Sequence, residues 1–169
     1  MSQHDQEKLT TIGLNQEKAS KLSERLNVLL ANFQMYYQNL RSVHWNVKGE
    51  NFFALHTKYE ELYTEAHVQI DEIAERILTL GVTPLHTFSD YIENSSIEAA
   101  KNVEKDRDTV KVVLDSIKKL LIIEREILDL SADADDEGTN AMMSDLIAGQ
   151  EKTAWMLNSF LGREIGAAN

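Results

Sequence analysis

Four long stretches of the chain place hydrophobic residues at helical spacing, and short stretches that contain glycine or proline separate them. In the first stretch the apolar positions recur every three or four residues, at Leu22, Leu26, Leu29, Phe33, Tyr36, Leu40, Val43 and Val47. This repeat is typical of a helix that buries one stripe of its surface. It predicts a first helix from about Gln16 to Val47.

The second stretch repeats the pattern between Asn51, which we expect to cap a helix, and Gly81, which we expect to end it. Its apolar positions are Leu55, Tyr59, Leu62, Ala66, Ile70, Ile73, Ile77 and Leu80. At about 1.5 Å per residue, the second helix is about 45 Å long.

Beyond Pro84, two residue pairs have the spacing of a helix N-terminus, Thr87 with Asp90 and Ser95 with Glu98. They predict a short helix near 88–94 and a long third helix from Ser96, followed by a loop over 131–138 and a fourth long helix. The apolar residues of the last two helices are Val103, Val110, Val113, Ile117, Leu120, Ile123 and Ile127, and then Met143, Leu146, Ala154, Leu157 and Leu161. The pattern predicts an all-α four-helix bundle, with the short extra helix in the connection between helices two and three.

Composition supports one helical domain over residues 1–169. The 169 residues include only 7 Gly and 1 Pro, too few turn-forming residues for a sandwich or barrel of many short strands. We expect residues 1–15 to form a flexible N-terminal tail. The start of the chain lacks a signal pattern and no apolar run approaches about 18 residues, so we expect a soluble cytoplasmic protein without a membrane partner.

The net charge of -11 disfavours nucleic acid as a partner, because a negative field repels phosphate. The first 21 residues contain no basic patch, since their Lys residues are balanced by Asp and Glu. The chain has no Cys, which excludes disulfides and thiolate metal sites. Any metal must therefore bind to imidazole and carboxylate groups.

The second helix carries a further face, roughly 90° to 180° from its apolar stripe. This face combines aromatic, histidine and carboxylate residues: Phe53, His56, Glu60, Tyr63, His67, Asp71, Glu75 and Leu78. A solvated face normally has more Lys and Ser and fewer large apolar side chains. We therefore expect it to be buried against another subunit, with the chemistry between chains.

Asp71 and Glu75 lie one helical turn apart on this face, where two like charges cost an isolated helix about 0.2 to 0.5 kcal/mol. A bound cation would remove this cost, but ion pairs with Arg76, Lys48 or another basic residue of the surface are the alternative. His44 and His56 flank the first break in the helices, and a single histidine there is more often a hydrogen-bonded bystander than a ligand. Together the four residues indicate a metal site.

An iron site inside the bundle is disfavoured, because the Glu-x-x-His repeat of that kind of site is absent. The residues three before the histidines at 44, 56, 67 and 86 are Arg41, Phe53, Thr64 and Thr83.

Three segments together resemble the Dps mini-ferritins: the run H-W-N-V-K-G at 44–49, His56, and the run D-E-I-A-E-R at 71–76. The resemblance implies a homo-dodecameric shell in which iron, as Fe(II), is oxidised at sites shared by two subunits. One subunit supplies His44 and His56, and its partner supplies Asp71 and Glu75. Glu60 is implied as a further ligand for a second iron, and Trp45 as a neighbour of the site.

The resemblance also implies that hydrogen peroxide is the preferred oxidant and that Fe(III) is mineralised inside the shell. Related shells have acidic entry pores near the start of the last helix, which here implies Asp133, Asp135 and Asp136. The alternative for these residues is an ordinary polar loop that caps a helix. Ala141 stands where some relatives have an acid.

Two other functions stay open. Some members of the family compact DNA through Lys-rich tails, but the N-terminal segment here is charge-neutral and the C-terminal residues 162–169 have only Arg163 against Glu164. An inert structural shell or adhesin is the third possibility, and the intact four-ligand set argues against it. His4, His67 and His86 are assigned no ligand role.

Overall fold

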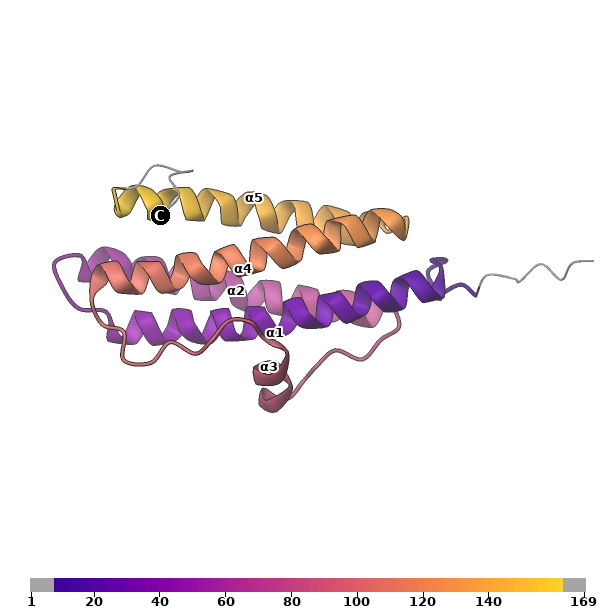
Figure 1. The fold of residues 1–169 in the computed structure, drawn as a ribbon, viewed down its shortest axis with the longest axis horizontal. Coiled ribbons are helices and arrows are strands. Elements are labelled where there is room, and N and C mark those ends of the chain that lie inside the picture. Colours follow the sequence, from indigo (N-terminus) through magenta and orange to yellow (C-terminus); the bar gives the residue numbers. More distant parts are fainter. Residues whose placement is uncertain (1–7, 163–169) are drawn as a thin grey trace, which may run out of the picture.

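The computed structural model describes residues 8–162, which form five helices and no strand. Four long helices lie along the long axis of the molecule, and a short one stands beside α1 (Figure 1). The elements are α1 (Gln16–Asn46), α2 (Phe52–Thr79), α3 (Phe88–Asn94), α4 (Asp106–Asp133) and α5 (Glu137–Phe160). The predicted all-α bundle with a short extra helix between its second and third long helices is confirmed.

The core lies between the stripes that the hydrophobic spacing predicts. Every predicted apolar position of α1 is buried, and so are those of α2 apart from the half-buried Ile70. α1 packs against α2 and α4, while α4 packs against α5. Tyr59 illustrates how polar atoms are accommodated: its ring is fully buried, and its hydroxyl lies 2.8 Å from the Thr109 hydroxyl.

The end of α2 is confirmed at Gly81, which adopts a left-handed conformation with φ +87°. Its N–H donates to the Leu78 carbonyl at 2.9 Å, and the Val82 N–H donates to the Ile77 carbonyl at 3.2 Å. This pair of bonds satisfies carbonyls that would otherwise lack partners at the helix end. The start of α2 differs from expectation, because Asn51 makes no side-chain capping bond and instead donates to Asp106 at 2.7 Å.

The predicted start of the third long helix at Ser96 is wrong, since α4 begins ten residues later at Asp106. Two buried amides of α1 hold the intervening backbone in an extended path. The Asn32 carbonyl oxygen accepts from the N–H groups of Ser96 and Ile97, at 3.1 and 3.2 Å. Asn39 accepts from Ala100 N–H and donates to the Glu98 carbonyl, both at 2.8 Å. The backbone of residues 96–100 thus bonds to α1, and it does not form the helix that the spacing of Ser95 and Glu98 predicts.

The loop predicted over 131–138 is also shorter, because α4 continues to Asp133 and α5 begins at Glu137. Asp136 caps α5 by accepting from the Thr139 N–H at 3.1 Å. At the other end of the chain, residues 1–7 lie outside the described residues, whereas 8–15 form a turn in which Gln16 N–H donates to the Lys8 carbonyl at 2.8 Å. The flexible tail over 1–15 and the single domain over 1–169 stay predictions. In the described part of the chain, no helix is long and apolar enough to cross a membrane.

Candidate metal centre

His44, near the end of α1, and His56, near the start of α2, lie against each other. Their rings stack with centroids 3.8 Å apart and planes inclined by 17°. Each ring also bonds to the other residue's backbone: His44 Nδ1 lies 2.7 Å from the His56 carbonyl oxygen, and His56 Nδ1 lies 2.9 Å from the His44 carbonyl oxygen. The His44 carbonyl belongs to the last turn of α1, where carbonyls lack helical partners. The two helix ends are thus joined through the histidines.

This pairing fixes the tautomer of both rings. A backbone carbonyl only accepts, so each Nδ1 must carry the proton and donate it. In the neutral ring, Nε2 then keeps a lone pair that can bind a cation. Metal-binding histidines in proteins are commonly oriented in this way: one ring nitrogen binds the metal, and the other donates its proton to a carbonyl or carboxylate. The sequence indicates the two histidines, and the geometry adds their preorganisation.

Aromatic side chains surround the pair. Tyr63 meets His44 edge-on with centroids 5.3 Å apart, and Phe52 stacks on His56 at 5.0 Å. Trp45 is exposed, and the Arg41 guanidinium lies 4.8 Å from the centre of its ring. The position of Trp45 beside a metal site stays a prediction.

Asp71 and Glu75 are exposed on α2. In the structure, neither Arg76 nor Lys48 forms an ion pair with them. Arg76 pairs with Asp136, and Lys48 Nζ lies 2.8 Å from a Glu104 carboxylate oxygen. Across residues 8–162, no ion pair involves either carboxylate. Both are therefore available to a cation.

One chain does not bring the four predicted ligands together. Asp71 follows His56 by 15 residues on the same helix, which is about 22 Å along its axis. Consistent with this separation, residues 8–162 contain no group of three or more His, Asp or Glu side chains that could hold a metal. The four-ligand site stays a prediction that requires a second copy of the chain.

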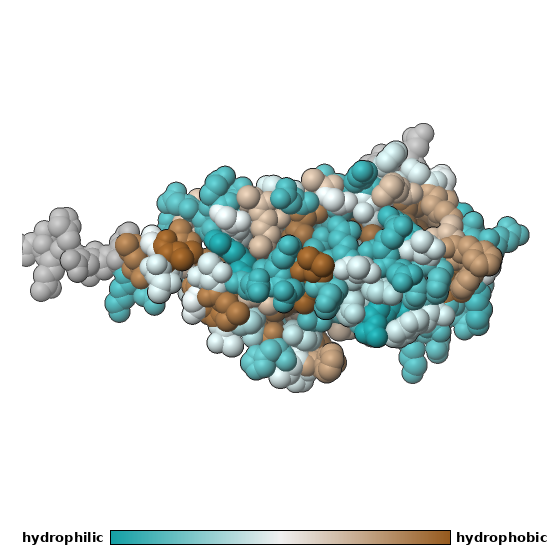
Figure 2. Space-filling view, turned by 180° about the vertical axis from the view of Figure 1, so that it is seen from behind, coloured by the Kyte–Doolittle hydropathy of each residue, from teal (hydrophilic) through white to brown (hydrophobic). Residues whose placement is uncertain are grey.

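The outer face of α2 is uncovered in the single chain. Phe53, Val68 and Leu78 are exposed on it, and the view from behind shows hydrophobic side chains set among hydrophilic ones (Figure 2). Glu60 is exposed one turn beyond His56, which agrees with an auxiliary ligand role but does not test it. The centre of the His67 ring lies 6.1 Å from that of Tyr37. His86 Nδ1 lies 2.9 Å from the Pro84 carbonyl oxygen, and His4 is outside the described residues.

The three predicted pore acids differ in their surroundings. Asp133 ends α4 with an exposed carboxylate 3.8 Å from Lys18 Nζ, and Asp135 is exposed with φ +55°. Asp136 is buried and accepts from Arg76 and Thr139. Burial alone would raise the pKa of Asp136, but the bonds from Arg76 and Thr139 outweigh it and hold the pKa below its usual range. Asp133 and Asp135 are exposed, as residues that line a pore must be. Asp136 is buried and already bonded to Arg76 and Thr139 of its own chain.

The Arg76–Asp136 pair is a structural contact that the sequence pattern did not reveal. It ties α2 to the start of α5, and the Arg76 side chain also donates through Nε to the Thr139 hydroxyl at 2.9 Å. Gly138 leaves room for it, since a Cβ there would meet a guanidinium nitrogen at 3.0 Å. The alternative given for the acidic loop, that it caps a helix, is confirmed for Asp136, which is the N-cap of α5.

Replacement of Arg76 by Met is expected to lower the free energy of unfolding by about 2–3 kcal/mol, because it leaves the buried Asp136 carboxylate without its cation. Chemical denaturation at pH 7 measures the change. Arg125→Met is the matched control, since its pair with Glu151 is half exposed and contributes about 0–1 kcal/mol. Equal losses in the two variants would contradict the role given to the Arg76 pair.

Comparison with known proteins agrees with this architecture. A family model described as a ferritin-like domain matches residues 23–165. The DNA protection during starvation protein of Porphyromonas gingivalis is 38% identical over 152 residues, which cover 90% of this chain and 96% of that one. A protein of Haemophilus influenzae is 46% identical over 150 residues, covering 89% and 94% of the two chains. The crystal structure of a Dps protein from Vibrio cholerae O1 superposes with a TM-score of 0.89 at 45% identity, and covers 90% of this chain and 96% of that one.

The bundle and the matched family model define a ferritin-like protein. Within that class, the chain belongs to the Dps family of mini-ferritins.

Proposed function

We propose that this protein is an iron-storage mini-ferritin that oxidises Fe(II) at sites shared by two subunits of a dodecameric, cytoplasmic shell. The observation that carries the proposal is the His44–His56 pair, whose Nδ1 atoms are both committed to carbonyls and whose Nε2 lone pairs are left for a cation. The Vibrio cholerae relative is described as a member of a superfamily of ferritin-like diiron-carboxylate proteins, which supports iron as the substrate.

A twofold axis across α2 accounts for the separation of the ligands. When two copies of α2 lie antiparallel, His56 of one copy faces residues 71 to 75 of the other if the axis passes about midway, near residues 64–65. The same operation creates a second, equivalent site. Two imidazoles from one chain, together with Asp71 and Glu75 from its partner, would then bind Fe(II). Glu60, on the same face as His56, would assist a second iron.

This ligand set suits iron oxidation. Nitrogen and carboxylate ligands hold Fe(II), stabilise the Fe(III) product and leave positions open to an oxidant. With hydrogen peroxide, two Fe(II) ions each give one electron, and both oxygen atoms leave as water or hydroxide rather than as a radical. Hydrolysis of the Fe(III) product then deposits ferric oxyhydroxide and releases protons. Asp133 and Asp135 would line the entry path for the ions.

The double variant His44→Gly/His56→Gly is expected to slow peroxide-driven Fe(II) oxidation by at least about 10-fold, because it removes both nitrogen ligands. Stopped-flow absorbance of the ferric product measures the rate, and gel filtration establishes that the shell remains assembled. His86→Gly is the matched control, since His86 is exposed in the loop before α3. If the parent is active and the assembled double variant oxidises iron equally fast, these residues are not the site. A parent that oxidises no iron would instead favour an inert shell.

DNA compaction is the second candidate, because several relatives are named for DNA protection during starvation. The charge of -11 opposes it. Residues 1–7 and 163–169, which belong to the two tails, lie outside the described residues. We expect no retardation of plasmid DNA in a gel-shift assay with micromolar shells at neutral pH and physiological salt. Retardation that disappears at high salt would establish DNA binding instead.

A further inference from the structure

Four rings form one continuous stack around the histidine pair. Phe52 lies face to face with His56, with centroids 5.0 Å apart and planes inclined by 25°. His56 and His44 stack at 3.8 Å, and Tyr63 follows by meeting His44 edge-on, at 5.3 Å and 83°. Each imidazole therefore contacts the other imidazole and one further aromatic ring.

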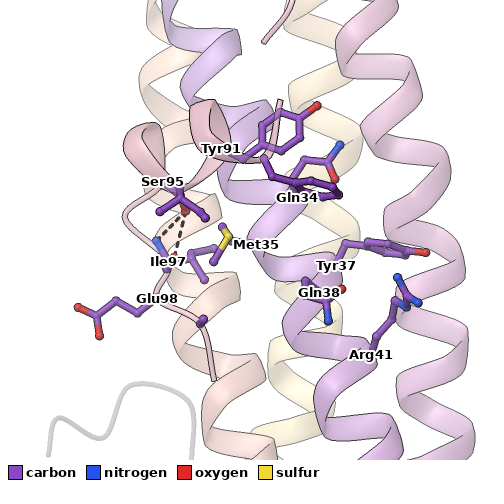
Figure 3. Close-up of a pocket in the computed structure, with 12 residues that line it drawn as sticks. Gln34, Met35, Tyr37, Gln38, Arg41, Tyr91, Ser95, Ile97 and Glu98 are labelled. Carbon is purple, nitrogen blue, oxygen red and sulfur yellow. Dashed lines mark hydrogen bonds between the residues drawn. The ribbon is translucent and has the colours of Figure 1, made fainter. Parts of the chain in front are cut away.

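The His44 end of this stack is supported by further side chains. Behind Tyr63, the ring of Tyr37 follows at 6.2 Å, and the Arg41 guanidinium lies 5.4 Å from the centre of the Tyr37 ring. Figure 3 shows Tyr37 and Arg41 side by side, at the edge of the surface groove that both residues line. His44 itself is buried, with only 7% of its surface exposed. Its orientation is thus fixed by several layers of neighbouring groups.

The His56 end of the stack depends on Phe52. Within residues 8–162, the only aromatic partners of His56 are His44 and Phe52, and His56 is more open to water than His44. Phe52 is the first residue of α2, and it packs against the hydrophobic core. Since Phe52 and His56 are four residues apart on one helix, their side chains lie on the same face. Phe52 is therefore a fixed surface on the helix that carries His56.

A single hydrogen bond does not hold an imidazole in one orientation. The bond from His56 Nδ1 to the His44 carbonyl fixes the tautomer, but the ring can still tilt about the N–H···O direction. Such a tilt would move the Nε2 lone pair away from a cation, and a ring on each face of His56 prevents it. Stacking also suits the metal-bound state. A cation draws electron density from the imidazole, and the electron-rich face of Phe52 attracts the resulting positive charge.

We infer that Phe52 is a positioning residue of the metal site: it holds the His56 ring against His44, in the orientation in which Nε2 binds a cation. The inference rests on the proposed function, because it requires His56 to be a ligand. Phe52 acts through His56 and does not touch the ion. Loss of its ring is therefore expected to weaken metal binding although all four proposed ligands remain.

The variant Phe52→Leu tests this role, because Leu keeps an apolar side chain against the core but has no ring to stack on His56. Co²⁺ alone is the probe, since its visible absorption bands depend on the ligands around it. We expect the dissociation constant for Co²⁺ to rise about 10-fold in assembled shells, with altered visible bands. Phe52→Tyr, which restores a ring, is expected to bind Co²⁺ like the parent. So is the matched control Phe160→Leu, which removes a half-buried ring from the end of α5.

The Co²⁺ signal that the parent has and His44→Gly/His56→Gly lacks belongs to the histidines. If the double variant keeps the whole signal, the proposed site fails and the role of Phe52 fails with it. If the signal belongs to the histidines but Phe52→Leu binds Co²⁺ like the parent, only the role of Phe52 fails. An equal loss of affinity in Phe52→Tyr or Phe160→Leu contradicts that role as well. Gel filtration establishes assembly; should Phe52→Leu not assemble, Phe52→Met takes its place and the same results decide.

Discussion

Co-assembly of two inactive variants is expected to restore about a quarter of the parent's iron oxidation. One variant, His44→Gly/His56→Gly, lacks the nitrogen ligands, and the other, Asp71→Asn/Glu75→Gln, lacks the carboxylates. Neither alone can form a complete site. In a mixed dimer, the histidines of the second variant face the carboxylates of the first, so one of its two sites is complete. Random pairing makes about half of the dimers mixed, which leaves about a quarter of all sites intact.

The measurement is the initial rate of Fe(II) oxidation after the two variants are unfolded together and refolded at equal concentrations. Mixing the variants after separate assembly is the control, and it should stay inactive. A site formed within one chain would give no recovery in either sample, because every chain lacks half of its ligands. Full recovery is equally incompatible with a shared site. The roughly 22 Å between His56 and Asp71 along α2 is the physical reason to expect the intermediate value.

Most of the fold could be predicted because hydrophobic spacing and glycine reflect local physics. The stripes of α1 and α2 are buried as expected, and Gly81 ends α2 because its left-handed conformation suits a residue without Cβ. The start of α4 could not be predicted in this way. Ser95 and Glu98 have the spacing of a cap, but Asn32 and Asn39 bind the backbone of residues 96–100 from a distant part of the chain. Such tertiary bonds leave no local pattern.

The candidate site shows the same division between local and distant information. His44 and His56 lie twelve positions apart across one tight connection, so their closeness follows from the break between two helices. Their tautomer depends on reciprocal bonds to carbonyls, which only the geometry reveals. The partner of Arg76 was likewise out of reach of sequence reasoning. Asp71 and Glu75 are its neighbours in the sequence, whereas Asp136 is 60 residues away.

Glu124 is a buried acid that is not among the ligands proposed for iron. Its side chain is inaccessible in α4, where it accepts from the Gln150 amide on α5. The second carboxyl oxygen and the Gln150 carbonyl oxygen have no hydrogen-bond partner among residues 8–162. Burial raises the pKa of Glu124 to about 8, against the opposing effects of the Gln150 bond and the Arg125 charge. At neutral pH the group is therefore mostly protonated, and ionisation would place an unpaired charge in the bundle.

The stability of the bundle is therefore expected to fall as the pH rises. The folded-state pKa of Glu124, about 8, lies above the value of about 4.5 in the unfolded chain, so the folded state binds the proton more tightly. Stability due to this proton is fully present below pH 4.5 and is lost by about pH 8. The shift corresponds to a loss on the order of 5 kcal/mol at alkaline pH.

The variant Glu124→Gln, which cannot ionise, should recover most of this loss at pH 8.5 and gain little at pH 5. Its amide can also donate to the Gln150 carbonyl oxygen, so the buried contact keeps its shape. Thermal unfolding at matched protein concentrations measures the difference, because assembly itself contributes to the melting temperature. Asp129→Asn, an exposed position on the same helix, should show no such dependence. If Glu124→Gln were equally stabilising at pH 5 and pH 8.5, the carboxyl of the parent would not ionise in this range. The stabilisation would then come from a change in packing.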